Sequence, residues 1–253
     1  MTILYFTATG NGLYLSKRIG GKLVSIPKAI KEGIYNFKDD KIGIIFPVYG
    51  WAVPQYIRDF LKRVQLESEY IFAIMSYGKI AGSPISHLQS IASENGIHFS
   101  YINIIKMIDN YLPVFDMKKE LKSEPNKQIE KHLNLIIDNI SNNKQWLASD
   151  QFMSKLITKL YWLKVDPYKT GIGITNKFRI ENSCAKCGVC AKVCPTDNIQ
   201  AESATPTFSN QCITCLACTH NCPKKAIRLS SEKSKERFRN RHISLDEIIE
   251  SNN

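Results

Sequence analysis

Eight cysteines stand in two runs of identical spacing, and the chain contains no others. Each run reads C-x2-C-x2-C-x3-C and is followed by proline; the runs comprise Cys184, Cys187, Cys190 and Cys194, then Cys212, Cys215, Cys218 and Cys222. This spacing is typical of chains that wrap a cubane [4Fe-4S] cluster and lend the fourth cysteine of each run to the neighbouring cluster. The sequence therefore predicts two [4Fe-4S] clusters, in an electron carrier or in an enzyme built around one.

Zinc and disulfides are the competing interpretations of these cysteines. A C-x2-C pair can hold half of a tetrahedral zinc site, but a third cysteine follows here at the same gap and a fourth precedes proline, twice over. Disulfides are disfavoured because Met1 leads straight into the apolar residues 3–6, without the features of a secretory signal. We therefore expect iron–sulfur clusters in a reducing compartment, the cytoplasm.

The two runs are related by a shift of 28 residues, and their flanks share it: Ile180 corresponds to Phe208, and Ile199 to Ile227. We expect two facing half-modules, each with a short strand, a cysteine-bearing loop and a turn into another short strand. The first cluster is expected to take its fourth ligand from the second run, and the second cluster to take Cys194. Residues 177 to about 231 resemble the small bacterial dicluster ferredoxins throughout their length.

The 176 residues before Lys177 are numerous enough for a second domain with its own core. Their most membrane-like stretch, residues 42–57, is broken by glycine and proline and is shorter than the roughly 18 residues of a spanning helix, so we expect no membrane span. Short apolar runs fit for strands buried on both faces occupy residues 3–6, 23–26, 42–46, 70–75 and 101–107.

Amphipathic segments at residues 12–19, 54–64 and 83–95 are predicted to be helices between these strands. Parallel neighbouring strands need such helical crossovers. The predicted fold class is therefore α/β, a doubly wound parallel sheet of five strands, followed by a small α+β dicluster domain.

In such sheets, ligands bind beyond the carboxyl ends of the strands, so the loops after the first, third and fourth strands are the informative ones. The first loop, residues 7–12, reads T-A-T-G-N-G and leads into a predicted helix, whose N-terminal N–H groups favour a phosphate. No lysine lies in this loop, so it is not a nucleotide-triphosphate P-loop. A helix start capped by side chains remains an alternative.

The loops after the third and fourth strands, residues 47–51 and 76–79, carry aromatic side chains that could enclose a planar ring. Ordinary loop packing of Tyr49, Trp51 and Tyr77 remains the alternative.

Taken together, residues 1 to about 145 resemble flavodoxin, whose phosphate loop has the form T/S-x-T-G-x-T; Gly12 stands here in place of the last hydroxyl residue. The resemblance implies FMN, with its phosphate on the first loop and its isoalloxazine between the other two. The implied FMN-binding residues are Thr7, Ala8, Thr9, Gly10, Asn11, Gly12, Pro47, Val48, Tyr49, Gly50, Trp51, Ser76, Tyr77, Gly78 and Gly82. With the ferredoxin-like part, the whole chain resembles the flavodoxin–ferredoxin fusion proteins common in anaerobes.

Beyond these loops, we expect a long polar loop over residues 108–125, in which Tyr111 could approach the flavin, and helices over residues 126–142 and 151–164. The second helix is expected to pack between the domains, with the joint at Pro167 and residues 171–173. The expected domains are an FMN-binding domain at 1–145, a helical linker at 146–176, the dicluster domain at 177–231 and a basic tail at 232–253.

The net charge of +11 falls to roughly +5 once two clusters and an FMN phosphate are counted. Eight of the basic residues lie between Lys224 and Arg241. They could form a docking patch for an acidic redox partner, contact nucleic acid or a membrane surface, or form a solvated tail; no nucleic-acid motif accompanies them. For His220, which lies within a cysteine run, we expect a solvent-facing position.

The function expected from these features is electron transfer between the two clusters and FMN. One alternative is a flavin oxidoreductase that draws electrons from the clusters to reduce a small substrate such as a quinone. Another is a redox or iron sensor. No G-x-G-x-x-G motif for a dinucleotide is present, which disfavours direct oxidation of NAD(P)H.

Overall fold

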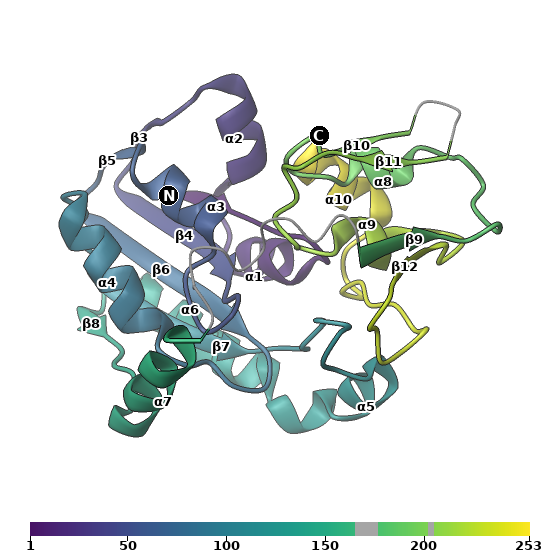
Figure 1. Cartoon of the computed structure of the whole chain (residues 1–253). Helices are drawn as coiled ribbons and strands as arrows, with labels where there is room; N and C mark the ends of the chain where they lie inside the picture. Colours follow the sequence, from purple (N-terminus) through teal and green to yellow (C-terminus); the bar gives the residue numbers. More distant parts are fainter. Residues whose placement is uncertain (165–176, 202–204) are drawn as a thin grey trace.

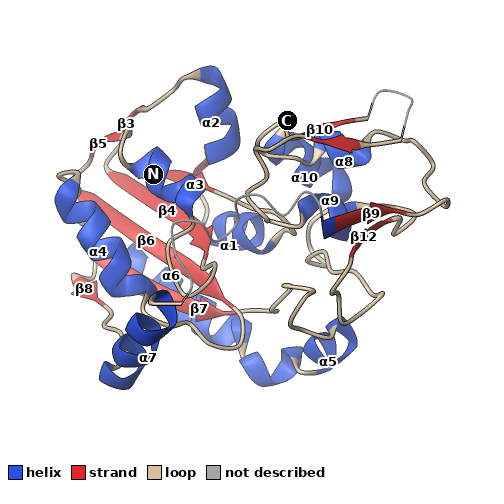
Figure 2. Cartoon of the chain, viewed as in Figure 1, coloured by secondary structure: helices blue, strands red, loops and turns tan. Residues whose placement is uncertain are grey.

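The computed structural model describes residues 1–164, 177–201 and 205–253. Its largest element is a six-stranded parallel sheet in the order β2-β1-β4-β6-β7-β8 (Figures 1 and 2). The strands are β1 (Thr2–Tyr5), β2 (Lys22–Ser25), β4 (Lys41–Pro47), β6 (Tyr70–Tyr77), β7 (Tyr101–Lys106) and β8 (Trp146–Leu147). The prediction of an α/β parallel sheet is confirmed.

The number of strands is a correction, because the predicted sheet had five. The sixth, β8, has two residues, both exposed, and pairs with the start of β7, so it carries no apolar run that could reveal it. A further parallel pair, β3 (Asn36–Lys38) with β5 (Gln65–Glu67), lies outside the main sheet and was not predicted.

Helices cover both faces of the main sheet. Alternate residues of β1 enter different cores, so that Ile3 lies in one and Leu4 in the other. The first core is covered by α1 (Asn11–Ile19) and α6 (Ile129–Ser141); the second is covered by α2 (Ile26–Glu32), α3 (Gln55–Leu61) and α4 (Pro84–Glu94). This two-sided covering explains why the central strands are apolar on both faces.

The dicluster region consists of two half-modules whose strands pair with each other. Strand β9 (Phe178–Ile180) pairs antiparallel with β12 (Ile227–Leu229), and β10 (Ile199–Gln200) pairs with β11 (Thr207–Phe208). Two short helices, α8 (Val189–Lys192) and α9 (Ala217–Asn221), occupy corresponding places in the cysteine runs. The facing half-modules expected from the repeat are therefore present.

The 28-residue repeat extends to the backbone conformation. Three pairs of residues have positive φ at corresponding positions: Lys186 and Thr214, Gly188 and Leu216, and Asp197 and Lys225. Because non-glycine residues rarely adopt this conformation, its recurrence shows that both loops wind in the same unusual way around their sites.

Three segments differ from expectation. Residues 108–125 include α5 (Met117–Lys122), and the 3-10 helix η1 (Glu124–Lys127) follows directly. Helix α7 (Phe152–Trp162) packs on the α/β domain rather than between the domains, since the ring of Trp51 contacts that of Tyr161 at 4.5 Å and the Trp162 indole donates to the Gly50 carbonyl. The predicted joint at Pro167 and residues 171–173 lies outside the described residues.

The C-terminal segment is folded, which corrects the picture of a solvated tail. Residues 245–252 form α10 (Leu245–Asn252), whose N-terminus has a complete capping box between Ser244 and Glu247. Ile243 and Ile248 are buried in the first core of the α/β domain together with residues of the dicluster region. Part of the basic charge is also paired, because Arg228 and Arg237 both contact the half-buried Glu232.

Across the described residues, no helix combines the length and the apolar character that crossing a membrane requires.

Candidate functional site

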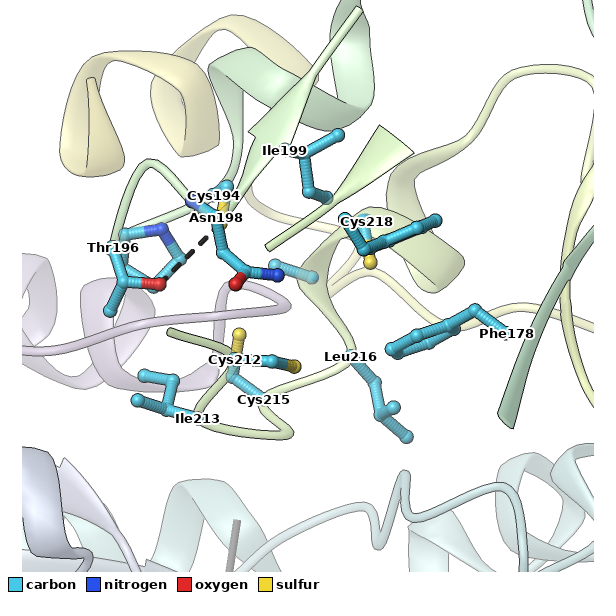
Figure 3. Close-up of a pocket in the computed structure, with 13 residues that line it drawn as sticks. Phe178, Cys194, Thr196, Asn198, Ile199, Cys212, Ile213, Cys215, Leu216 and Cys218 are labelled. Atoms are coloured by element: carbon cyan, nitrogen blue, oxygen red, sulfur yellow. Dashed lines mark hydrogen bonds between the residues drawn. The ribbon is translucent and has the colours of Figure 1, made fainter. Parts of the chain in front are cut away.

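Four cysteine side chains line one cavity in the dicluster region, and we call this group the inner site. It comprises Cys194, Cys212, Cys215 and Cys218 (Figure 3). Apolar side chains complete the wall of the cavity, among them Phe178, Ile199 and Leu216, and Phe178 stacks on Phe208 at 4.9 Å. Three members of the inner site come from the second run and one from the first, as the crossed arrangement predicts.

In the inner site, a thiolate is unfavourable unless a cation lies close to it. Burial, with the neighbouring charge of Cys194, raises the pKa of Cys215 and Cys218 well above the ordinary thiol value. Burial also raises the pKa of Cys212. Such groups become thiolates when a cation binds, because the cation supplies the missing compensation. The donor set thus fits an iron–sulfur cluster, whose irons are bound by four thiolates.

The remaining four cysteines, Cys184, Cys187, Cys190 and Cys222, form what we call the outer site. Burial raises the pKa of Cys190 to about 11, and the nearby charges of Cys222 and Cys187 add to this effect. The charge of Cys222 thus acts on a cysteine of the first run, so the two lie near each other; that Cys222 is a ligand of this site stays a prediction. Cys187 is exposed and Cys184 is half-buried, so the outer site reaches the protein surface.

Backbone N–H groups donate to corresponding sulfur atoms in the two sites. The N–H of Asn198 lies 3.4 Å from the Sγ of Cys194, and the N–H of Ala226 lies 3.3 Å from the Sγ of Cys222. Both donors follow their cysteine by four residues, in keeping with the internal repeat. Such bonds stabilise electron density on sulfur and are one of the means by which a protein sets a cluster's reduction potential.

Within residues 1–164, 177–201 and 205–253, no three His, Cys, Asp or Glu side chains are arranged to hold a single metal ion. The cysteines of the inner site instead surround a cavity, as the ligands of a polynuclear cluster do.

Residues 183–227 match the model of the 4Fe-4S dicluster domain family. This part of the chain is thus a 4Fe-4S dicluster domain, and the prediction of an iron–sulfur, ferredoxin-like region is confirmed. A search of curated proteins finds no match to the chain.

The inner site lies against the α/β domain. Cys215 and Ile213 pack on the second core beside Tyr49 and Tyr56. The hydroxyl of Tyr56 donates to the Pro195 carbonyl at 3.3 Å. Burial and the nearby Cys215 raise the pKa of both tyrosines, so both remain neutral phenols at physiological pH. Tyr49, predicted to flank a flavin, is thus a neighbour of the inner site.

The 7–12 loop, predicted to hold a phosphate, is buried under other parts of the chain. The side-chain amides of Asn252 and Asn221 donate to the carbonyls of Thr7 and Ala8, both at 3.1 Å. The backbone N–H of Asn240 donates to the carbonyl of Thr9 at 2.8 Å. Three consecutive carbonyls of the loop are therefore bonded by residues of the dicluster region and the C-terminal segment.

Apolar atoms cover the glycine of this loop. A Cβ built on Gly10 would lie 2.9 Å from the Cβ of Asn240 and 3.1 Å from the Cβ of Ile243. The space in front of the N-terminus of α1, where a phosphate would bind, is thus filled by the C-terminal segment. In this arrangement the residues do not fit FMN.

The two loops predicted to enclose the isoalloxazine are in contact with each other. A Cβ on Gly82 would lie 2.2 Å from the Cβ of Trp51, which brings the two loops together. A Cβ on Gly78 would lie 1.9 Å from a carboxylate oxygen of Asp109, in the loop after β7. The aromatic side chains also diverge, because Trp51 contacts α7 while Tyr49 packs toward the inner site.

His220 is buried between the α/β domain and the C-terminal segment, so the expected solvent-facing position is wrong. Its Nδ1 accepts from the N–H of Phe238 at 3.0 Å, and its Nε2 lies 2.7 Å from the carbonyl oxygen of Asn110. The Nε2 must therefore carry the proton and donate.

The partners of the 7–12 loop were missed because single asparagines carry no motif, and because their approach depends on tertiary packing.

Proposed function

We propose that the chain is an electron-transfer protein that carries two [4Fe-4S] clusters, one in the inner site and one in the outer site. The observation that carries this proposal is the convergence of Cys194 with three cysteines of the other run on one cavity. When bound, such clusters supply one-electron chemistry. The protein's own contribution is to hold the thiolates, donate N–H groups to sulfur and limit the access of water.

The two sites differ in exposure, and this difference supports distinct roles. The outer site, with the exposed Cys187, is the entry and exit point for electrons exchanged with a partner. The inner site, enclosed by apolar side chains and the α/β domain, exchanges electrons through the outer one. Lys186 and Lys192 are exposed close to Cys187 in the sequence, which supports a partner that is acidic at its contact surface.

FMN was predicted as a further carrier, and a flavin-dependent reductase was the alternative function. Both would require the segment around Asn240 and Ile243 to leave the 7–12 loop. We therefore assign no electron-transfer step to a flavin. The strand order β2-β1-β4-β6-β7 is that of flavodoxin-like folds, so the resemblance supports a shared fold rather than a shared cofactor.

The proposal is tested by anaerobic purification followed by iron, sulfide and flavin analysis and a redox titration. We expect about eight irons per chain and two one-electron transitions. Bound zinc, or a single cluster after complete reconstitution, would contradict the proposal. Exchanging Lys186 and Lys192 for Glu should slow reduction by an acidic ferredoxin-type donor and leave the iron content unchanged. Lys131→Glu with Lys144→Glu, at exposed positions on and just after α6 of the α/β domain, is the matched charge control.

A further inference from the structure

We propose that the 7–12 loop is an internal docking socket, which holds the dicluster domain and the C-terminal segment against the α/β domain in place of a cofactor phosphate. Three separate elements meet there: α9 through Asn221, the segment before α10 through Asn240, and the last turn of α10 through Asn252. Each brings a buried asparagine to the same loop.

The polarity of the socket opposes an anion. The loop presents three carbonyl oxygens, and the asparagine amides turn their NH2 groups toward two of them. Their other atoms, Oδ1 of Asn221 and Oδ1 of Asn252, are buried acceptors without a hydrogen-bond partner in the described part of the chain. Reversing either amide would place two oxygens against each other, so this orientation is fixed by the loop. A phosphate at the N-terminus of α1 would also have to displace Asn240 and Ile243, whose Cβ atoms lie 2.9 and 3.1 Å from a Cβ built on Gly10.

A ring of further contacts surrounds the socket and depends on the same docking. The rings of Tyr14 and His242 stack at 4.9 Å, and the hydroxyls of Tyr5 and Ser251 share a hydrogen bond of 2.9 Å. Ion pairs join Lys17 to Glu247 at 2.7 Å and Lys31 to Asp197 at 2.6 Å. These contacts link α1, β1 and α2 to both the dicluster domain and the C-terminal segment.

Socket docking fixes where the inner site lies. The 7–12 loop, helix α3 and the loop after β7 all bond to the dicluster domain, through Ala8, Tyr56 and Asn110 respectively. Separating the domains would exchange these hydrogen bonds for bonds to water and would expose apolar side chains such as Ile243 and Ile248, so the set keeps the domains together. The loop that resembles a phosphate site therefore acts as a structural joint between an α/β domain and an electron carrier.

The test uses the cluster-loaded protein with Asn240→Ala combined with Asn252→Ala, and with Asn253→Ala as the matched control at an exposed position. Amide hydrogen exchange is measured over residues 2–14. We expect the double variant to exchange at least about tenfold faster there, corresponding to about 1.4 kcal/mol, and the control to match the wild type. Unchanged exchange in the double variant would overturn the socket.

FMN titration of the same proteins gives the second readout. We expect the wild type to bind FMN more weakly than about 100 µM, because the docked segment must first be displaced. Wild-type binding at about 1 µM or tighter would overturn the proposal, whatever the iron content. If the double variant does not fold, Asn252→Asp replaces it: this near-isosteric change sets a carboxylate against the Thr7 carbonyl and should accelerate exchange in the same peptide.

A separate observation concerns α7, which turns its apolar face to solvent. Thr158 is its one fully buried residue in the described structure, whereas Phe152 is 79% exposed and Leu163 is 78% exposed. The exposed apolar face of α7 comprises Phe152, Met153, Leu156, Ile157 and Leu160, and Leu163 follows directly after the helix. Several large apolar side chains exposed side by side on one helix mark an interaction site.

Charge and position indicate what this face binds. Lys155, Lys159 and Lys164 are exposed, and no acidic residue occurs from Gln151 to Lys164. Figure 1 shows α7 at the end of the α/β domain away from the dicluster region, so a redox partner bound there would lie far from the clusters. An apolar helical face flanked by lysines is the pattern of a helix that lies in the interface of an anionic membrane.

We infer that α7 binds the surface of anionic lipid bilayers, its apolar face inserted and its lysines at the headgroups. The test is flotation of the cluster-loaded protein with vesicles of phosphatidylcholine alone or with phosphatidylserine. We expect binding that needs phosphatidylserine, weakens with salt and is lost in Leu156→Glu with Leu160→Glu, while Leu121→Glu on α5 binds as the wild type does. If the leucine variant loses iron, Lys155→Glu with Lys159→Glu takes its place, and its binding to the vesicles should likewise be lost.

Two outcomes would overturn the lipid assignment. One is the absence of binding to phosphatidylserine vesicles. The other is concentration-dependent dimerisation that the leucine pair abolishes, because the face would then bind a second copy of this chain.

Discussion

The side-chain amide of Asn252, the next-to-last residue of the sequence, donates to the backbone carbonyl of Thr7 at 3.1 Å. This contact joins the end of α10 to the 7–12 loop that follows β1, so the C-terminal segment is part of the α/β domain's packing. The segment also bonds to α1 and lies beside the dicluster domain. The protein should therefore respond as one unit to changes in α10.

Ile248→Ala tests this coupling. Ile248 is fully buried in the core shared by both domains, so we expect a loss of about 3 kcal/mol in the free energy of unfolding. This loss is measured by chemical denaturation, which is followed both by circular dichroism and by cluster absorbance. Both signals should shift together. Ile249→Ala, at a half-buried position of the same helix, is the control and should cost less.

Cys194→Ser tests the exchange of ligands between the runs. Cys194 lies in the first run but lines the inner site, so we expect its loss to damage the inner cluster and to leave the outer one intact. Electron paramagnetic resonance of the reduced protein follows the change. Losing either cluster removes the coupling between two reduced clusters, so the spectrum of the remaining cluster must be compared with that of Cys187→Ser, and the two spectra should differ. Cys187→Ser, at the exposed position, is the reciprocal variant. Loss of the outer cluster in Cys194→Ser would contradict the pairing.

His87 predicts how stability depends on pH. Burial, reinforced by the positive charge of Arg58 and opposed by Glu94, lowers the pKa of His87 to about 4, and its Nδ1 accepts from the N–H of Val53. In the unfolded chain the His87 imidazole takes up a proton near pH 6.5, whereas in the folded protein it stays neutral down to about pH 4. Neutral His87 therefore contributes fully to stability above pH 6.5, and this contribution is lost as the pH falls toward 4. Between pH 7.5 and 5.5 we expect a loss of about 1 kcal/mol from this group.

The measurement is a series of denaturation curves over that pH range. His87→Asn keeps an acceptor near Val53 but cannot titrate, so its stability should depend less steeply on pH than that of the wild type. Equal slopes for both proteins would contradict the assignment.

Much of the fold could be predicted because its signals are local. The five longer strands of the main sheet are apolar runs, and the cysteine spacing alone predicted the dicluster domain that the family match confirms, since ligation geometry constrains sequence so tightly. By contrast, β8 and α5 carry no strong pattern, and their positions depend on tertiary contacts. The amphipathic pattern of α7 predicted a helix correctly but did not tell which face would be buried.

The 7–12 loop shows where a sequence pattern reaches its limit. Residues that can bind a phosphate can equally well be bonded by asparagines, because both use a glycine-containing turn before a helix. Which partner fills the loop depends on segments more than 200 positions away, such as Asn221 and Asn252. No local pattern contains that information.

Gly12 provides the sharpest test between these two interpretations. If the loop were a phosphate site lacking one hydroxyl, Gly12→Thr would strengthen FMN binding. A Cβ at this position, however, would lie 2.2 Å from the carbonyl oxygen of Phe6, which is backbone and cannot move alone. We therefore expect Gly12→Thr to destabilise the protein by several kcal/mol, on the order of other overpacked cores, without any gain in FMN affinity.

Gly33→Ala is the matched control for this variant, because Gly33 has φ of 69° but, among the described residues, no atom lies within 4 Å of the place that its Cβ would occupy. It should cost about 1 kcal/mol, the strain of a left-handed alanine. Thermal unfolding gives the stabilities, and fluorescence titration gives the FMN affinity. A folded Gly12→Thr protein that binds FMN tightly would show that α1 can move away from β1 and that the loop is a phosphate site after all.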